Sequence, residues 1–326
     1  MKAWLKEFLT GLSIRQEYIC IGERLSDSLR AFLTYQNTLE CLEVTERHIF
    51  LGYKPLVIAI VFSGDESTTE DMEICLSLSK SELSINSQWK GFHADRTSIA
   101  RLHLRPIKRT RLATHRVVFY EGVSGRHRFI SVLHQRVNAF LMNFKTKSVG
   151  NVFLNGNLYD QTRIAYAIAR KISLMIVSDG SLFNLFPTDL HGAVGEDYYI
   201  SSLRLDGEAC KQVEQYRKVV ISDIEATQFR IAYQLGKNHM MKMRPRENFD
   251  WLGEFTKVFN FPLPQGTEFY RELELTQSFD VGIHRLFFFK VVNTKKLKDS
   301  SPLAHIHQYY AQWRINEGFK TQWLLR

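Results

Sequence analysis

The residues between 269 and 293 constrain the fold of this chain more than any other segment. Polar and apolar residues alternate from Phe269 to Gln277 (FYRELELTQ), which is the pattern of a half-buried strand. The run from His284 to Asn293 (HRLFFFKVVN) is rich in aromatic and β-branched residues, which favour strands. Asp280-Val281-Gly282 lies between them and is a turn sequence. Two long strands joined by a short turn predict a β-hairpin.

The rest of the second half continues this strand-rich pattern. Helices are expected over Tyr159–Lys171, with Asp160 as N-cap, over Ala209–Tyr216 and from Thr227 to Leu235. Strands are expected over Ile172–Val177, Ser181–Phe186, Tyr198–Leu203 and Val219–Ile224. Pro187 should stop regular pairing and leave 188–197 as an irregular loop. Many strands, few helices and no βαβ rhythm argue against a doubly wound sheet and favour a small barrel.

The first half also mixes helices and strands. A short amphipathic helix is expected at the N-terminus, a second over Leu25–Tyr35 and a third over Phe129–Phe144. Strands are expected over Leu39–Val44, His48–Phe62 and His115–Tyr120, the last ending in a turn at Glu121–Gly125. No internal repeat is visible, and no catalytic motif is recognised. We therefore predict an unassigned α+β domain over 1–147, a connection at Lys145–Gly150 and a second domain over 151–326.

Composition excludes some classes of protein. The chain has 326 residues, of which 44% are hydrophobic and 24% charged, as in ordinary globular proteins. No apolar stretch reaches the roughly 18 residues of a membrane-spanning helix. The four cysteines (Cys20, Cys41, Cys75 and Cys210) form no CxxC pair, so we expect a reduced cytoplasmic protein with ordinary buried thiols.

The net charge of +9 is concentrated in one segment. Residues 101–136 contain nine Lys or Arg against the single acid Glu121, so that this segment alone carries +8 by count. Such a segment can bind an anion, including nucleic acid. A solvated basic face, or one neutralised by acids elsewhere, explains it better. Few aromatic residues interleave with the basic ones, so support for base stacking is thin.

The order of elements in the second half resembles the flavin reductase-like FMN-binding family. The resemblance covers roughly Leu158 to Tyr310. It rests on motifs that follow one another in the family's order. The first are Asp179-Gly180, Asn184 and Thr188, followed by Ser201, Ser202 and Arg204. A helix with Lys211 and the strand Val219-Val220-Ile221-Ser222 come next, and the last motifs are Gly282-Ile283-His284 and Pro302-Leu303 with Tyr309 or Tyr310.

The resemblance implies a split β-barrel of the FMN-binding type for the C-terminal domain, and hence an α+β protein. It also implies an FMN-binding oxidoreductase that transfers hydride from NAD(P)H to flavin, with His284 beside the reacting ring, and a homodimer with flavin at or near the subunit interface. The residues it assigns to the cofactor are Asn184, Thr188, Asp189, Ser201, Ser202, Arg204 and Lys211. Hydroxyls and a fork-shaped cation suit the phosphate of such a cofactor, and its chemistry needs no acid–base triad.

Two other readings remain open. The barrel could bind flavin or another ligand without reductase activity, and the N-terminal half would then determine the biological role of the protein. Alternatively, residues 101–136 could bind nucleic acid, which would require a steep salt dependence. A metal site is not expected, because His305 and His307 have no third ligand at suitable spacing.

Overall fold

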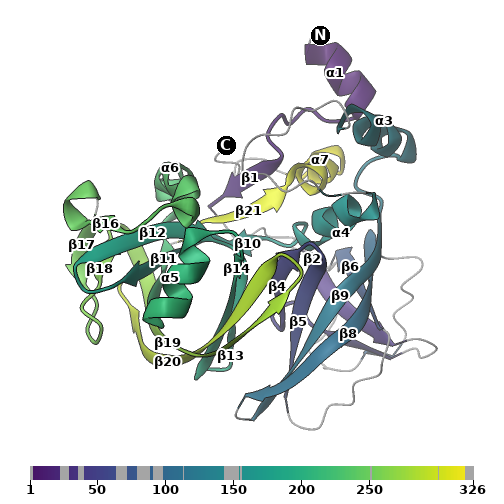
Figure 1. Cartoon of the computed structure of the whole chain (residues 1–326). Helices are drawn as coiled ribbons and strands as arrows, with labels where there is room; N and C mark the ends of the chain where they lie inside the picture. Colours follow the sequence, from purple (N-terminus) through teal and green to yellow (C-terminus); the bar gives the residue numbers. More distant parts are fainter. Residues whose placement is uncertain are drawn as a thin grey trace.

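Two antiparallel sheets of eight strands each stand side by side in this protein (Figure 1). The computed structural model describes residues 3–22, 29–35, 40–63, 72–78, 89–90, 98–112, 114–142, 154, 156–249, 252–299 and 301–319. The purple and blue sheet comes from the first half of the chain, and the teal to yellow sheet from the second half. The predicted connection at 145–150 lies outside the described residues.

The N-terminal sheet has the order β4-β5-β9-β8-β6-β2-β3-β7. Its strands are β2 (Leu29–Tyr35), β3 (Glu40–Glu43), β4 (His48–Tyr53), β5 (Leu56–Ser63), β6 (Met72–Leu78), β7 (Trp89–Lys90), β8 (Ala100–Leu112) and β9 (His115–His127). Strand β5 is apolar and buried on both faces, as its continuous β-branched run predicted.

The C-terminal sheet has the order β13-β14-β20-β19-β15-β11-β12-β16. Its strands are β11 (Ser173–Ser178), β12 (Leu182–Thr188), β13 (His191–Val194), β14 (Tyr198–Arg204), β15 (Lys218–Ile224), β16 (Arg244–Pro245), β19 (Thr267–Val281) and β20 (His284–Lys296). A separate two-stranded sheet pairs β17 (Leu252–Phe255) with β18 (Pro262–Pro264). The hairpin predicted from residues 269–293 is therefore confirmed as β19 and β20.

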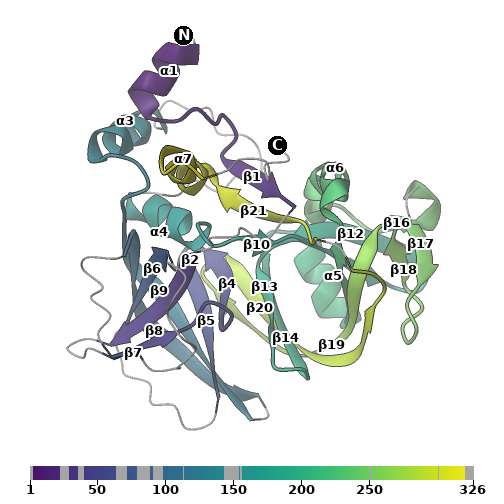
Figure 2. The same cartoon turned by 180° about the vertical axis from the view of Figure 1, so that it is seen from behind.

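A third, small sheet ties the two ends of the chain together. In it β21 (Ala304–His307) lies between β1 (Tyr18–Ile21) and β10 (Arg170–Lys171) (Figure 2). The helices are α1 (Ala3–Thr10), α3 (Val132–Met142), α4 (Asn157–Ala165), α5 (Glu208–Tyr216), α6 (Phe229–Gln234) and α7 (Gln308–Asn316), with short 3-10 helices at 226–228, 235–240 and 246–248. Residues of α4 and α7 share one buried core with the N-terminal sheet, so the last helix among the described residues stabilises the first half of the chain.

The two large sheets have the same topology. When the eight strands of each sheet are counted in chain order, both sheets read third, fourth, eighth, seventh, fifth, first, second, sixth. Their central hairpins, β8–β9 and β19–β20, also agree in detail. Each has two register shifts, and each second strand begins with a His-Arg pair followed by four apolar residues, HRVVFY in β9 and HRLFFF in β20. The structure thus contains a repeat that the sequence alone did not predict.

The two sheets pack on each other through matching strands. One buried cluster joins residues of β4, β5 and β9 to residues of β13, β14 and β20, among them Phe119 and Phe288, whose ring centroids are 5.6 Å apart. Gly52 of β4 lies against His284, and Gly195, which follows β13, lies against His115. These reciprocal contacts join equivalent positions of the two halves, so the sheets face each other about an approximate twofold axis.

Most of the predicted strands and helices are confirmed, but several details differ. The segment expected to be helical up to Tyr35 is strand β2 from Leu29 onward, and residues 25–28 lie outside the described residues. Leu29, Ala31, Phe32 and Leu33 are buried, which fits a strand inside the sheet between β6 and β3. The turn expected at 121–125 is wrong, because β9 continues through it to His127 and pairs with β8.

Three differences concern the segment around the predicted site. Pro187 does not stop β12, since it lies opposite Leu174, and its missing N–H is tolerated within the strand. The loop expected over 188–197 contains strand β13, which pairs with β14. Helix α4 begins earlier than predicted, with Gly156 as N-cap, and Asp160 instead accepts a hydrogen bond of 2.8 Å from Arg163.

Candidate functional site

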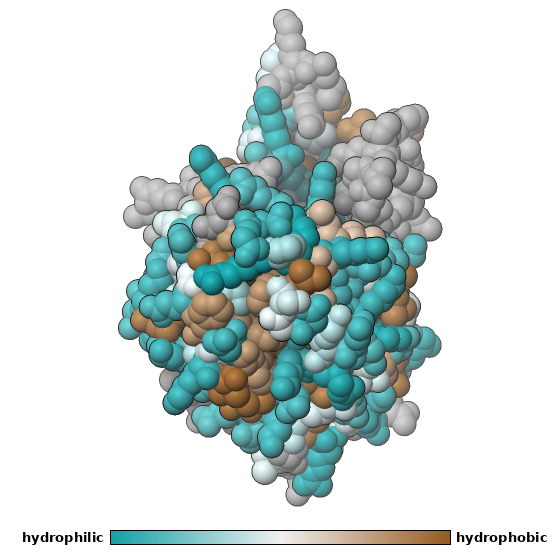
Figure 3. Space-filling view, turned by 60° about the vertical axis from the view of Figure 1, so that its left-hand side comes forward, coloured by the Kyte–Doolittle hydropathy of each residue, from teal (hydrophilic) through white to brown (hydrophobic). Residues whose placement is uncertain are grey.

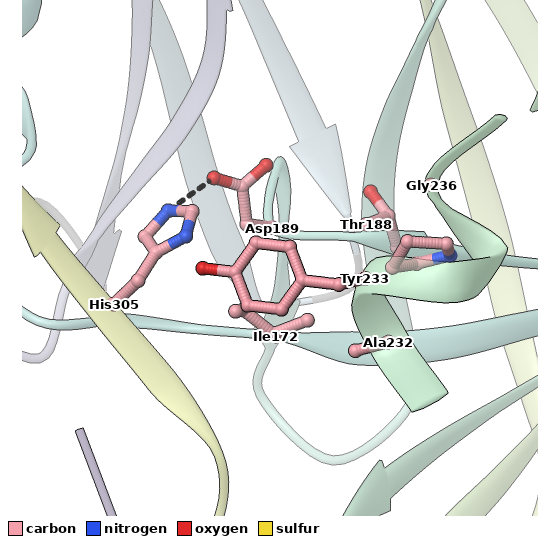
Figure 4. A pocket seen from close by; sticks show the side chains of 8 residues that line it. Ile172, Thr188, Asp189, Ala232, Tyr233, Gly236 and His305 are labelled. Atoms are coloured by element: carbon pink, nitrogen blue, oxygen red, sulfur yellow. Dashed lines mark ion pairs between the residues drawn. The ribbon is translucent and has the colours of Figure 1, made fainter. Parts of the chain in front are cut away.

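A slot opens beside the loop that joins β12 to β13. It has a volume of about 230 Å³. The residues around it come from β12, α6, the 3-10 helix at 235–240, β21 and the segments next to them, and they are Ile172, Pro187, Thr188, Asp189, Ala232, Tyr233, Gly236 and His305 (Figure 4). Its walls are mostly apolar, while Asp189 and His305 place a carboxylate and an imidazole at one end. The mixture of apolar walls and few polar groups is typical of small-molecule sites.

The polar end of the slot is a buried network around Asp189. Tyr166 donates a hydrogen bond of 2.7 Å to Asp189 Oδ2, and His305 Nε2 lies 2.8 Å from the same oxygen. Burial alone would raise the pKa of Asp189, but the contacts with His305 and Tyr166 lower it below the ordinary value. Burial, followed by the charge of Asp189, raises the pKa of the Tyr166 hydroxyl well above its ordinary value. Asp189 is therefore ionised at neutral pH and holds both partners in place.

Another side of the slot is formed by Tyr233 on α6. In Figure 4 its side chain extends from the helix toward Asp189 and His305. Its hydroxyl is 3.2 Å from the Sγ atom of Cys20 on β1, so the small third sheet supports this wall. The Tyr233 side chain is 40% exposed, which leaves the slot open to solvent. Figure 3 shows hydrophobic residues in small groups among hydrophilic ones on one side of the molecule.

A second cavity is also bordered by Asp189. It has a volume of about 410 Å³ and is bordered by both halves of the chain. Polar and charged side chains line much of it, namely Thr45, Glu46 and His48 from the first half, and Arg170, Lys171, Asp189 and His191 from the second. We call it the interhalf cleft. Asp189 belongs to both cavities, so the slot and the cleft are neighbours.

Two of the predicted cofactor residues, Thr188 and Asp189, border the slot. Asn184 lies elsewhere, fully buried in β12. Its Nδ2 donates to Gln212 Oε1 at 2.7 Å and to the backbone oxygens of Asn238 and Met241 at 3.1 and 3.2 Å. These bonds fasten the segment after α6 to the sheet.

A second group of predicted residues meets at the interface between the two sheets. Ser202 Oγ is 3.2 Å from His284 Nδ1, and the His284 ring lies edge-on to Tyr53 of the other half, with centroids 4.7 Å apart. His284 is 1% exposed, and its Nε2 has no hydrogen-bond partner among the described residues. Burial, followed by the charge of Arg204, lowers the pKa of His284 to about 4. Arg204 in turn donates to Asp206 at 2.5 Å.

The remaining two predicted residues are not joined to either group by any contact among the described residues. Ser201 is fully buried in β14, and its hydroxyl has no partner among the described residues. Lys211 is exposed on α5 and pairs with Glu208 at 2.6 Å. The sequence did not single out Tyr166 or Tyr233 for the site. Nothing in the local sequence marks these two tyrosines as site residues, because each is a single aromatic residue in or next to a helix. Only the packing of distant elements brings them to the site.

The described residues contain neither a metal-binding cluster nor a membrane-spanning helix. Within the part of the chain that the structure describes, no three His, Cys, Asp or Glu side chains gather closely enough to hold a metal ion. No helix of that part is long and apolar enough to cross a membrane. Cys20 and Cys210 are buried thiols that are not joined in a disulfide.

Comparison with known proteins gives matches at the level of structure. No family model and no curated protein matches the sequence. BorF, the flavin reductase component of a bacterial two-component tryptophan halogenase, is 14% identical over 45% of this chain and 92% of its own, with a TM-score of 0.40. The NADH:FAD oxidoreductase SgcE6 of Streptomyces globisporus C-1027 is 11% identical over 50% and 96%, with a TM-score of 0.40. The FMN-binding protein of Thermus thermophilus is 15% identical over 47% and 82%, with a TM-score of 0.35.

Each of these matches covers about half of the chain. The strand-rich α+β class predicted for the chain is confirmed.

Proposed function

We propose that this protein is a flavin-binding oxidoreductase whose C-terminal half is a split β-barrel of the FMN-binding type. The observation that carries the proposal is the slot between Tyr233 and the loop at Thr188 and Asp189. An isoalloxazine ring is flat, apolar on its faces and polar along its edge. The slot offers apolar side chains on its walls and a carboxylate–imidazole pair at one end, which suits such a ring.

The size of the slot limits which part of the cofactor it can hold. A volume of about 230 Å³ is below the usual range of about 300–1,000 Å³ for sites that take a whole drug-sized ligand. We propose that the ring enters the slot while the ribityl phosphate lies outside it. FMN, when bound, would supply the hydride chemistry, with NAD(P)H as the donor.

The side chains of the chain would then bind and orient the ring. Ionised Asp189 accepts hydrogen bonds and suits the N–H at the ring edge, and Tyr166 keeps that carboxylate fixed. Tyr233 would cover one face of the ring. Ser202, Arg204 and His284 form a separate polar group, for which we retain the proposed role of holding a phosphate or the nicotinamide. Asn184, Ser201 and Lys211 stay in the proposal as sequence-based candidates only.

The oligomeric state belongs to the same proposal. The resemblance implies a homodimer with flavin near the interface between subunits. Two sheets of one topology already face each other inside this chain, and Gly52 and Tyr53 of the first half reach His284 of the second. We propose that one chain supplies both sides of the interface, so that a monomer of 38.1 kDa is sufficient. Sedimentation equilibrium would separate this mass from that of a dimer.

The alternative is a binding protein that holds flavin without reducing it. The added N-terminal sheet favours this alternative, because it covers one side of the C-terminal half. Anaerobic titration of the FMN-loaded protein with NADH or NADPH separates the two. Loss of the visible flavin absorbance at a rate above that of free FMN supports the oxidoreductase, and an unchanged rate supports the passive binder.

A further inference from the structure

Helices α1 and α3 present large apolar side chains to solvent. The four most exposed large apolar side chains among the described residues all belong to these two helices, and they are Trp4 (65%), Phe8 (74%), Val132 (63%) and Leu133 (69%). Single exposed apolar residues are normal on a protein surface, but a group of them at one place marks a surface that binds another molecule. The two helices are therefore a candidate interaction surface.

The spacing of these residues places them together on each helix. Trp4 and Phe8 are four residues apart, so they lie on one face of α1. Val132 and Leu133 lie four and three residues before Arg136, which is also exposed, so the three share one face of α3. The outward face of α3 therefore combines apolar side chains with a cation.

The two helices are held together at one end of the molecule. Asn138 of α3 donates a hydrogen bond of 2.7 Å from Nδ2 to the backbone oxygen of Thr10, the last residue of α1. Gly11, which follows α1, lies against the ring of His134 on α3. Both views of the fold show the two helices at the same end, with α1 farthest from the large sheets (Figures 1 and 2). We call residues 3–10 and 132–142 the helical end.

The charge of this end of the molecule distinguishes between possible partners. Residues 122–142 contain no acidic residue and three arginines, all exposed, namely Arg126, Arg128 and Arg136. None of the three takes part in an ion pair among the described residues. A second copy of this chain would bring the same arginines toward each other, and facing like charges are unfavourable. An anionic lipid surface instead offers negative charge and an apolar layer together.

From these observations we infer that the helical end docks on an anionic lipid surface. Trp4, Phe8 and Leu133 enter the boundary between headgroups and acyl chains, and Arg128 and Arg136 contact the lipid phosphates. Apolar side chains next to cationic ones are the pattern of helices that lie in a membrane interface. The long stem of Arg136 lets its charge stay among the headgroups while Leu133 beside it is buried. The inference uses no residue of the proposed flavin site.

Co-sedimentation of the full chain with lipid vesicles tests the inference. We expect binding to vesicles of phosphatidylcholine and phosphatidylserine that weakens at high salt, and little binding to phosphatidylcholine alone. Phe8→Ser and Leu133→Ser should each weaken binding about tenfold through the loss of buried apolar area. Arg136→Gln should weaken it about fivefold through the loss of one cation at the lipid surface. Val258→Ser is the matched control and should bind as the parent does, because Val258 is also exposed but lies between β17 and β18 in the C-terminal half.

Several results would overturn the inference. No vesicle binding, equal binding to both kinds of vesicle, equal binding of all variants, or a loss confined to one of the two helices would each contradict it. Sedimentation velocity without lipid tests the competing partner. A dimer that Phe8→Ser and Leu133→Ser both dissociate would identify a second copy of this chain as the partner and would also overturn the inference. Circular dichroism and the unfolding midpoint check that each variant is folded, and the vesicle assay does not depend on whether FMN binds.

Discussion

Replacing Gly195 by alanine should destabilise the protein through a contact between its two halves. Gly195 has a φ of +62°, which an alanine adopts at a cost of about 1–2 kcal/mol. A methyl group there would also lie 2.6 Å from Cε1 of His115. Since His115 is on the opposite sheet, it or the β13–β14 turn must move, and such overpacking costs about 1–3 kcal/mol. We expect a total loss of about 2–5 kcal/mol in the free energy of unfolding.

Gly318 offers a matched control for the backbone part of this loss. Its φ is +79°, and no atom lies within 4 Å of the position that a methyl group would take. Gly318→Ala should therefore cost only the backbone part, about 1–2 kcal/mol. Urea unfolding of both variants gives the excess due to the contact. In a His115→Ala background the excess should largely disappear, because the ring that the methyl group meets is gone.

Two results would refute this reasoning. Equal destabilisation by Gly195→Ala and Gly318→Ala would mean that the His115 contact has no energetic weight. An excess that persists in the His115→Ala background would place the strain within β13 and its turn. Either result would remove the energetic support for reciprocal packing of the two halves.

Three further predictions concern the site. Tyr233→Ala should weaken FMN binding by about 1–2 kcal/mol through the loss of an aromatic face, and Tyr233→Phe should retain it, as measured by quenching of flavin fluorescence. Arg204→Ala should weaken FMN binding in the same assay if Arg204 holds the phosphate, whereas unchanged affinity would move the phosphate elsewhere. Stability should fall as pH falls from 6.5 toward 4, because the depressed pKa of His284 (about 4) lets the unfolded state bind the proton first. His284→Gln should flatten that slope by up to about 1.4 kcal/mol per pH unit in urea unfolding at several pH values, and an unchanged slope would contradict it.

Local patterns were enough to predict much of the C-terminal half. The hairpin of β19 and β20 could be predicted from the alternation of polar and apolar residues and from the turn sequence between the strands, and α5 from the helical spacing of its apolar residues. The ends of β12 and β9 depend instead on the strands that pair with them, which local sequence patterns do not contain. Pro187 remains in β12 because Leu174 lies opposite it, and residues 121–125 remain in β9 because β8 is long enough to pair with them. Such long-range pairing is absent from any short stretch of sequence.

The repeat of the two sheets could be predicted even less from the local sequence. Its local traces in the sequence are short, namely the strands HRVVFY and HRLFFF and the His-x3-Gly pattern of residues 48–52 and 191–195. The candidate site depends on the same kind of information. Thr188 and Asp189 could be predicted from the resemblance, but Tyr166, Tyr233 and His305 join them only after distant elements have packed.

The most direct test of the central claim is the visible absorption spectrum of the purified protein after incubation with FMN and gel filtration. We predict the two-band spectrum of oxidised flavin in the protein peak, near one flavin per chain, and its bleaching by NADH or NADPH under anaerobic conditions. A colourless protein peak, with the fluorescence of added FMN unchanged by the protein, would contradict the account and leave the slot beside Asp189 without its proposed ligand.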